Sequence, residues 1–219
     1  ETNFINYLFV SFCILIIVNG SNFIDGLNTL VIGYYSIITI IIYKVNLLSV
    51  IPIDSSLILS WISLLLFIYV LNLLNKLFLG DSGAYFLGFS YAILLIMIHN
   101  QDLSVSPFFI ILLLWYPGFE ILFSIIRKIN SKASPLSPDI KHLHQIIFIS
   151  LNRTFFKKKI YANIISANII NLYNIIIFFI AINDISKTSL QIMLIMINIF
   201  IYIITYFILI KNHKLSGNS

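Results

Sequence analysis

The residue that bears most directly on chemistry is Asp81, a carboxylate that stands between Gly80 and Gly83 in the stretch LFLGDSGAYFLGF. The chain of 219 residues is 60% hydrophobic and contains only eight acidic residues, so packing explains poorly a carboxylate on a glycine-rich turn beside an apolar run. The pattern indicates a ligand. The alternative is an N-cap of a helix that begins near Gly83, and the two roles are compatible because a helix N-terminus also favours the anionic groups that a metal ion would bring.

A second polar cluster, NGSNFIDGLN, occupies residues 19–28. Asn19, Asn22 and Asp25 recur at a spacing of three and would share one face of a helix. The two glycines of the cluster would let the backbone approach a ligand closely or adopt a positive φ. The alternative is a solvated turn between helices, because polar residues at the end of a membrane helix cost little free energy. Three polar residues on one face are less expected from such a turn.

A third cluster, SPLSPDIKHLHQ, places His142 and His144 two residues apart. In an extended segment both imidazoles would lie on one side, whereas in a helix they would lie about 200° apart. A zinc site requires more soft ligands than one thiol and two histidines supply. The cluster therefore favours basic and hydrogen-bonding groups for a phosphate.

Glu120 lies inside an apolar run, three residues after Pro117-Gly118, where we expect a helix to break or bend. An ionisable group in a membrane span is either functional or paired. Two roles stay open for it, a structural partner for a basic loop and a place in the site. Further along the chain, interhelical hydrogen bonds are expected rather than substrate contacts for the asparagines Asn163, Asn168, Asn171, Asn174 and Asn198.

The composition predicts that membrane helices position these residues. A mean hydropathy of +1.02 and a charged fraction of 10% exclude a soluble globular protein. Because lipid cannot satisfy a bare backbone, each apolar run must be helical. The sequence predicts an all-α, polytopic integral membrane helix bundle, a single domain over residues 1–219 with about seven transmembrane helices. The predicted runs are residues 6–18, 27–43, 57–74, 83–99, 108–126, 160–182 and 190–210.

The long loop at residues 127–159 sets the expected topology. It carries eight of the thirteen Lys and Arg residues against one acid, Asp139, which by the positive-inside rule makes it cytoplasmic. Alternation of the helices then places the turns at residues 19–26 and 75–82 on the same side, together with all three clusters. A transporter or a non-catalytic scaffold, the alternative class, would instead line a pathway near the midplane.

In this order the three clusters resemble the motifs of the polyprenyl-phosphate N-acetylhexosamine-1-phosphate transferases. NFIDGLN is similar to the family's N-F-x-D-G-x-[DN]-G-L, FLGDSGAYFLGF to its F-x-G-D-x-G-[SA]-x-x-L-G-F, and SPDIKHLHQ to its S-P-D-x-x-H-x-H-H. The resemblance covers roughly residues 19–145. It implies transfer of an N-acetylhexosamine 1-phosphate from a UDP-sugar to a polyprenyl (undecaprenyl) phosphate with release of UMP.

The resemblance also implies roles for single residues. Asp81 matches the magnesium ligand, with Mn²⁺ as the alternative ion. The implied catalytic residues are Asp25, Asp81, His142 and His144. The implied substrate-binding residues are Asn19, Asn22, Gly26, Leu27, Asn28, Lys76 and Phe78, of which Gly26, Leu27, Asn28 and Phe78 match positions around the uridine. Lys76 and the histidines would meet phosphates.

Further implied are a site that faces the cytoplasm at a bacterial inner membrane, partners limited to the two substrates and the bilayer without nucleic acid, and a homodimer as one option for assembly. Three substitutions depart from the family pattern. Asn28 and Thr29 stand where Asp and Gly are frequent, and Gln145 stands where a third histidine is usual. The first and last resemble the subgroup that initiates lipopolysaccharide and capsule synthesis, with phospho-muramoyl-pentapeptide transfer in peptidoglycan synthesis as the alternative.

The family's adjacent Asp-Asp pair has no counterpart, because no two acidic residues of the sequence adjoin. From this absence, from the start at Glu1 and from the short first run we expect the sequence to be the C-terminal portion of a longer enzyme. Such a portion is expected to be inactive alone, since positioning a lipid phosphate beside a metal ion calls for more acidic groups.

Overall fold

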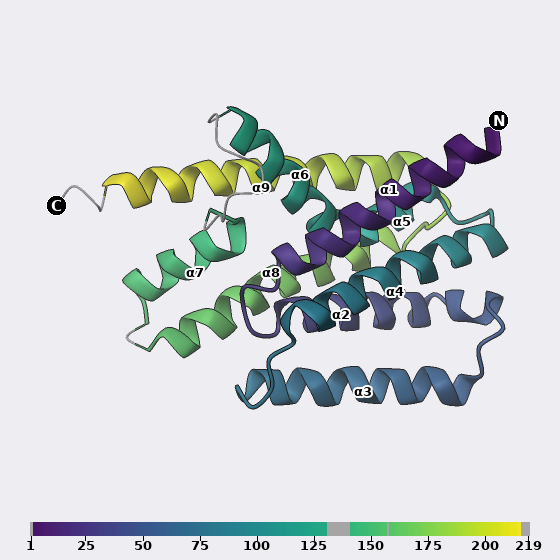
Figure 1. The fold of residues 1–219 in the computed structure, drawn as a ribbon, viewed down its shortest axis with the longest axis horizontal. Coiled ribbons are helices and arrows are strands. Elements are labelled where there is room, and N and C mark those ends of the chain that lie inside the picture. The colour runs from purple at the N-terminus through teal and green to yellow at the C-terminus, as the bar shows by residue number, and fades with distance from the viewer. Residues whose placement is uncertain (1, 131–140, 157, 216–219) are drawn as a thin grey trace.

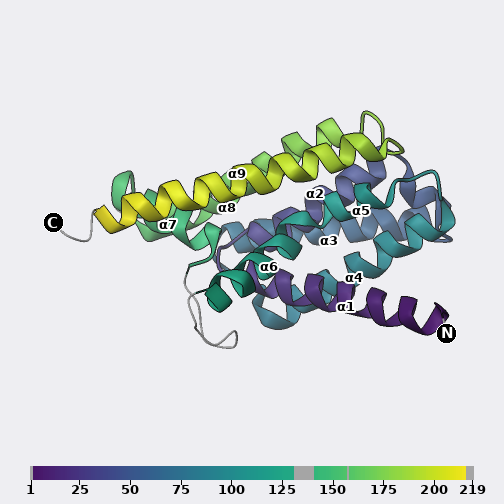
Figure 2. The ribbon, with the colours of Figure 1, turned by 90° about the horizontal axis from the view of Figure 1, so that it is seen from above.

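The computed structural model describes residues 2–130, 141–156 and 158–215, and all regular structure in these ranges is helical. The start of α1 (Thr2–Phe23) and the end of α9 (Thr188–Leu215) lie at opposite ends of the long axis (Figure 1). α1 lies beside α4 (Gly80–Gln101), and α9 and α8 (Lys159–Ala181) lie on the far side of the bundle (Figure 2). The predicted all-α fold class is confirmed.

In the part of the chain that the structure describes, five helices are long and apolar enough to cross a membrane, namely α1, α4, α8, α9 and α3 (Ser55–Leu73). α5 (Pro107–Leu113) and α6 (Trp115–Asn130) pass the same test together, as one span bent by 73°. These six spans match six of the seven predicted runs. The seventh run forms α2 (Leu30–Lys44), whose 15 residues extend for only about 22 Å, less than the thickness of the hydrocarbon core.

The short helix α2 forms the centre of the bundle. It is apolar all round and buried on nearly every side, which is typical of a central helix. It contacts α3, α4 and α8, and the 3₁₀ helix η1 (Leu47–Val50) follows it. Outside this group, α7 (Leu143–Thr154) packs against α8 and α9. The bundle core therefore fixes α4 and α8 relative to one another through α2.

The break in the bent span falls at Leu114, three residues before the expected position at Pro117. The reason is a side chain from α2. The Tyr34 hydroxyl donates to the Leu113 carbonyl (2.8 Å) and accepts from the Tyr116 N–H (3.4 Å), so it takes the place of backbone partners at the break. Pro117 then lies in the first turn of α6, where its missing N–H costs nothing.

A close crossing of α1 and α6 fixes where the end of α1 lies along α6. A Cβ atom added at Gly20 would lie 2.2 Å from the Pro117 carbonyl oxygen, far below any tolerated contact. Only glycine therefore lets the two helices approach here. The crossing sets the end of α1, with its polar cluster, beside the turn of α6 that carries Glu120.

Candidate functional site

The first and second clusters meet where α1 ends and α4 begins. The Asn22 amide Nδ2 donates to Asp81 Oδ1 at 2.9 Å, although the two residues are 59 positions apart. Asp25 follows in the turn after α1 and is close enough to Asp81 for their charges to interact. The structure thus brings together Asn22, Asp25 and Asp81, three of the residues singled out by sequence.

Burial raises the pKa of the Asp25 carboxyl to about 6, and the negative charge of Asp81 acts in the same direction. A hydrogen bond from the Gly80 N–H opposes the increase. Two carboxylates that repel one another at the edge of a membrane bundle make an electrostatic environment that favours a cation.

α4 begins at Gly80, three residues earlier than the N-cap alternative required. Gly80 has a φ of +67°, a conformation that glycine adopts at little cost. Asp81 lies inside the first turn, and its N-cap neighbour Leu79 makes no side-chain cap. Because Asp81 Oδ1 is hydrogen-bonded to another helix rather than to the start of its own, the capping interpretation does not describe it.

Asparagine side chains hold the turn that follows Asp25. Thr29, at a φ of +71°, has both backbone polar groups hydrogen-bonded: its N–H donates to Asn72 Oδ1, and its carbonyl accepts from Asn171 Nδ2 at 2.9 Å. Its hydroxyl accepts from Asn168 Nδ2 at 3.1 Å. The strained conformation is stabilised from α3 and α8, a tertiary link that sequence reasoning missed.

The neighbouring Asn28 is held in the same way. Its N–H donates to Asn163 Oδ1 at 2.8 Å, and its Nδ2 donates to Asn75 Oδ1. Asn72 also donates to the Leu77 carbonyl at 2.7 Å and so connects this turn with the segment that leads to α4. Asn163, Asn168 and Asn171 of α8 therefore bond to the turn at residues 28–29. The expected bonds between helices are also present: Asn168 accepts from the Tyr69 hydroxyl of α3, Asn174 from Trp115 Nε1 of α6, and Asn198 of α9 from the Tyr173 hydroxyl of α8.

The described part of the third cluster, residues 141–145, lies against Glu120, and residues 134–140 of that cluster lie outside the described residues. His142 Nδ1 is 3.1 Å from Glu120 Oε1, and the same oxygen accepts from the Leu143 N–H (3.2 Å) and the Tyr202 hydroxyl (2.9 Å). Glu120 is 1% exposed. Of its two open roles, a partner for the histidine segment is the one that the structure displays. Tyr202 carried no sequence signal beyond its place in an apolar run.

His144 is completely buried beside the first cluster. Its ring stacks on that of His142, with centroids 5.7 Å apart and planes at 13°, so the extended N-cap backbone of His142 places both imidazoles on one side. A Cβ atom at Gly26 would lie 2.5 Å from His144 Nε2, which requires glycine there. Burial lowers the pKa of His144 to about 4, against an opposing effect of Glu120.

The other candidates lie further away or point elsewhere. Asn19 is exposed, and its Nδ2 donates within α1 to the Leu15 carbonyl (2.8 Å). Leu27 is 4% exposed and belongs to the hydrophobic core. Lys76 and Phe78 are exposed in the linker between α3 and α4. Their assigned roles stay predictions.

The donor set fits a magnesium ion. Within the described residues, no group of three or more His, Cys, Asp or Glu side chains is arranged to hold a metal ion. Asp25, in the turn after α1, and Asp81, in the first turn of α4, form a pair of carboxylates whose charges interact. Magnesium binds to one or two protein carboxylates and completes its shell with water and substrate phosphates, so a pair is enough for a substrate-dependent site.

The sequence matches the family described as glycosyl transferase family 4 over residues 1–99, which include Asn22, Asp25 and Asp81 but not His142 or His144. No solved structure matches the chain. Three curated proteins are similar to it. The undecaprenyl-phosphate alpha-N-acetylglucosaminyl 1-phosphate transferase of Thermotoga maritima is 37% identical over 71 residues, which are 32% of this chain and 23% of that protein.

The probable undecaprenyl-phosphate N-acetylglucosaminyl 1-phosphate transferase of Bacillus subtilis is 33% identical over 135 residues, 58% of this chain and 36% of that protein. The undecaprenyl-phosphate alpha-N-acetylglucosaminyl 1-phosphate transferase of Yersinia pestis is 25% identical over 147 residues, 64% of this chain and 40% of that protein. The chain therefore spans less than half the length of the curated relatives it matches.

Proposed function

We propose that this protein, whose sequence matches glycosyl transferase family 4 over residues 1–99, transfers an N-acetylhexosamine 1-phosphate from a UDP-sugar to a polyprenyl phosphate in the bacterial inner membrane. The observation that carries the proposal is the hydrogen bond from Asn22 Nδ2 to Asp81 Oδ1 (2.9 Å), with Asp25 near enough for its charge to interact with that of Asp81. It joins two motifs 59 residues apart into one carboxylate site at the ends of two membrane-capable helices. Such a place is accessible to a soluble nucleotide and to a lipid.

In the reaction an oxygen of the lipid phosphate attacks the β-phosphorus of the UDP-sugar. The bond from that phosphorus to the oxygen shared with the α-phosphorus breaks, a new diphosphate forms, and UMP leaves. The transfer is mainly a task of positioning and charge stabilisation. Bound Mg²⁺ would neutralise charge on the diphosphate. Asp81 and Asp25 would hold it, and Asn22 keeps the Asp81 carboxylate oriented.

The chain's other groups would bind and orient the substrates. The turn at residues 26–29, held by asparagine side chains, would shape the nucleotide pocket. Lys76 is exposed beside the carboxylates along the chain and would meet a phosphate. His144 is neutral near pH 7 because of its burial, so a hydrogen bond rather than a charge is what it would offer.

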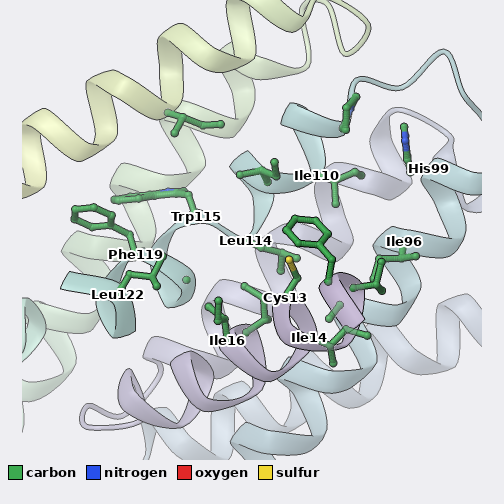
Figure 3. Close-up of a pocket in the computed structure, with 18 of the residues that line it drawn as sticks. Cys13, Ile14, Ile16, Ile96, His99, Ile110, Leu114, Trp115, Phe119 and Leu122 are labelled. Carbon is green, nitrogen blue, oxygen red and sulfur yellow. The ribbon is translucent and has the colours of Figure 1, made fainter. Parts of the chain in front are cut away.

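An apolar cavity supports a lipid substrate. It has a volume of about 570 Å³ and lies between α1, α4, the bent α5–α6 span and α9 (Figure 3). Its walls include Cys13, Ile96 and Phe119. Hydrocarbon walls favour an isoprenoid chain over a polar ligand.

The test is transfer by the full-length gene product in detergent with undecaprenyl phosphate, Mg²⁺ and radiolabelled UDP-N-acetylglucosamine. We expect UMP and a butanol-extractable labelled lipid in equal amounts. UDP-N-acetylmuramoyl-pentapeptide, offered in a parallel reaction, distinguishes the peptidoglycan alternative by donor choice. Absence of UMP with every UDP-sugar, in protein that is folded and inserted, would contradict the proposal.

The proposed cytoplasmic orientation has its own test. Its support is the excess of positive charge at residues 127–159. In a Cys13→Ser background, a cysteine at the exposed Thr154 should react with an impermeant maleimide only after the membrane is opened, and one at the exposed Ser104 should react in intact cells. Equal labelling of the two from one side would contradict this topology.

A further inference from the structure

Glu120 is a buried carboxylate that the proposed metal site does not use. One of its oxygens, Oε1, accepts hydrogen bonds from the Leu143 N–H and the Tyr202 hydroxyl and lies 3.1 Å from His142 Nδ1. These partners belong to the start of α7 and to α9, so a single oxygen on α6 joins three helices. A carboxylate oxygen can only accept, and Nδ1 therefore carries the proton in this contact. Nε2 is left as the ring nitrogen with which His142 can contact another group.

The contact fixes where α7 begins. The first N–H groups of a helix have no partner within it, and Glu120 supplies one for Leu143 from a different helix. The two histidines at the start of α7 in turn contact residues next to Asp25. His142 lies edge-on to Phe23 (centroids 5.2 Å, planes at 62°), and His144 is in contact with Gly26, the neighbour of Asp25.

The arrangement is costly, which argues against a purely stabilising role. Within the described residues, both ring nitrogens of His144 are buried without a hydrogen-bond partner. Buried polar atoms of this kind reduce stability, and apolar residues of similar size would pack at least as well. Native proteins tolerate such defects mainly at functional sites.

We propose that Glu120 is a positioning residue, which through Oε1 holds His142 and His144 against the turn at residues 23–26 and so sets their place beside the carboxylates. The inference rests on the proposed function for its kinetic part only. Its structural part, the anchoring of α7, can be measured without any substrate.

The kinetic experiment uses the full-length protein with three substitutions. Glu120→Ala removes the anchor, and Glu120→Gln keeps its shape and an acceptor oxygen. Asn174→Leu is the matched control, since it breaks a buried hydrogen bond between α8 and the same span, from Trp115 Nε1 at 2.8 Å, without contact to α7. Because hydrogen bonds to a charged group are stronger than those between neutral groups, we expect kcat/KM to fall about 100-fold in Glu120→Ala and about 10-fold in Glu120→Gln, chiefly through kcat. The control should stay within about threefold.

A double-mutant cycle separates positioning from general destabilisation. In a His142→Ala background, Glu120→Gln should change kcat/KM by less than about twofold, because its effect passes through the histidine. An undiminished 10-fold loss in that background, or normal kcat/KM in Glu120→Ala, would overturn the inference. If Glu120→Ala does not fold, the Gln variant and the cycle decide.

Hydrogen–deuterium exchange tests the anchor independently of catalysis. Amides in the first turns of α7 should exchange at least about tenfold faster in Glu120→Ala than in the wild type, while those of α2 stay unchanged. Unchanged exchange in α7 would refute the anchor even if activity fell. Absence of UMP release from the wild type would refute the proposed function and leave this measurement valid.

Discussion

The two sides of the candidate site are built in opposite ways. On the carboxylate side, Asp81 is exposed and Asp25 half-buried, and the turn after them is held by several amides from α3 and α8. On the histidine side, His142 and His144 are buried and one carboxylate, Glu120, anchors them. Water and ions can reach the first side through the exposed Asp81 carboxylate. The second side is a desolvated wall, formed by the start of α7 where it meets Glu120.

The largest expected loss of transfer follows from a substitution on the carboxylate side. Asp81→Asn removes a ligand for Mg²⁺, and transfer should fall about a thousandfold, or about 4 kcal/mol of transition-state stabilisation. The measurement is UMP release at saturating Mg²⁺ from the full-length protein. Asp102→Asn, which changes a carboxylate at the other end of α4, is the control and should keep near-normal turnover. Comparable turnover of the two variants would remove Asp81 from the site.

The histidine side should make the stability of the folded protein sensitive to acid. His144 has a pKa of about 4 in the folded protein against an ordinary value of 6.5, so the unfolded chain binds the proton more readily. Its contribution is present above pH 6.5 and is lost as the pH falls towards 4, about 3 kcal/mol in all. Thermal unfolding in detergent at pH 7 and pH 4.5 measures it. His144→Leu should lose this acid sensitivity, and a variant as acid-sensitive as the wild type would contradict the assignment.

The contribution of Asp25 to stability should change with pH in the opposite direction. Its folded pKa of about 6 exceeds the ordinary 3.8, so its stabilising contribution is complete below pH 3.8 and is lost as the pH rises through 6. With allowance for its partial exposure the loss is about 1 kcal/mol. Asp25→Asn should therefore raise the unfolding temperature at pH 7.5 in metal-free buffer. A lower unfolding temperature would mean that Asp25 is stabilised by contacts other than those described.

The smallest expected effect concerns the turn between the two sides. Thr29 has a φ of +71°, a conformation that costs a β-branched residue about 1 kcal/mol. Thr29→Gly should relieve this strain and raise the unfolding free energy by about 0.5–1 kcal/mol. Thr39→Gly, within helix α2, should instead lower it. Destabilisation by both substitutions would show that the hydroxyl bond to Asn168 outweighs the strain.

Much of this protein was determined by sequence alone. An all-helical membrane bundle follows from composition, because hydrocarbon leaves the backbone no other way to satisfy its polar groups. The proximity of Asp25 and Asp81 was also within reach, since alternating helices bring the turns that carry them to one face. Asp81 is exposed in the first turn of its own helix, so its accessibility follows from a local feature of its motif.

Only the tertiary structure decided the rest, and in each case the reason is a partner far along the chain. Tyr34 of α2 places the helix break at Leu114, and Asn163 holds Asn28 across 135 residues. Glu120 was visible as an anomalous charge, but its partners come from α7 and α9. Burial and hydrogen-bond partners arise from packing, and His144 is a neutral group within the site because the fold encloses it.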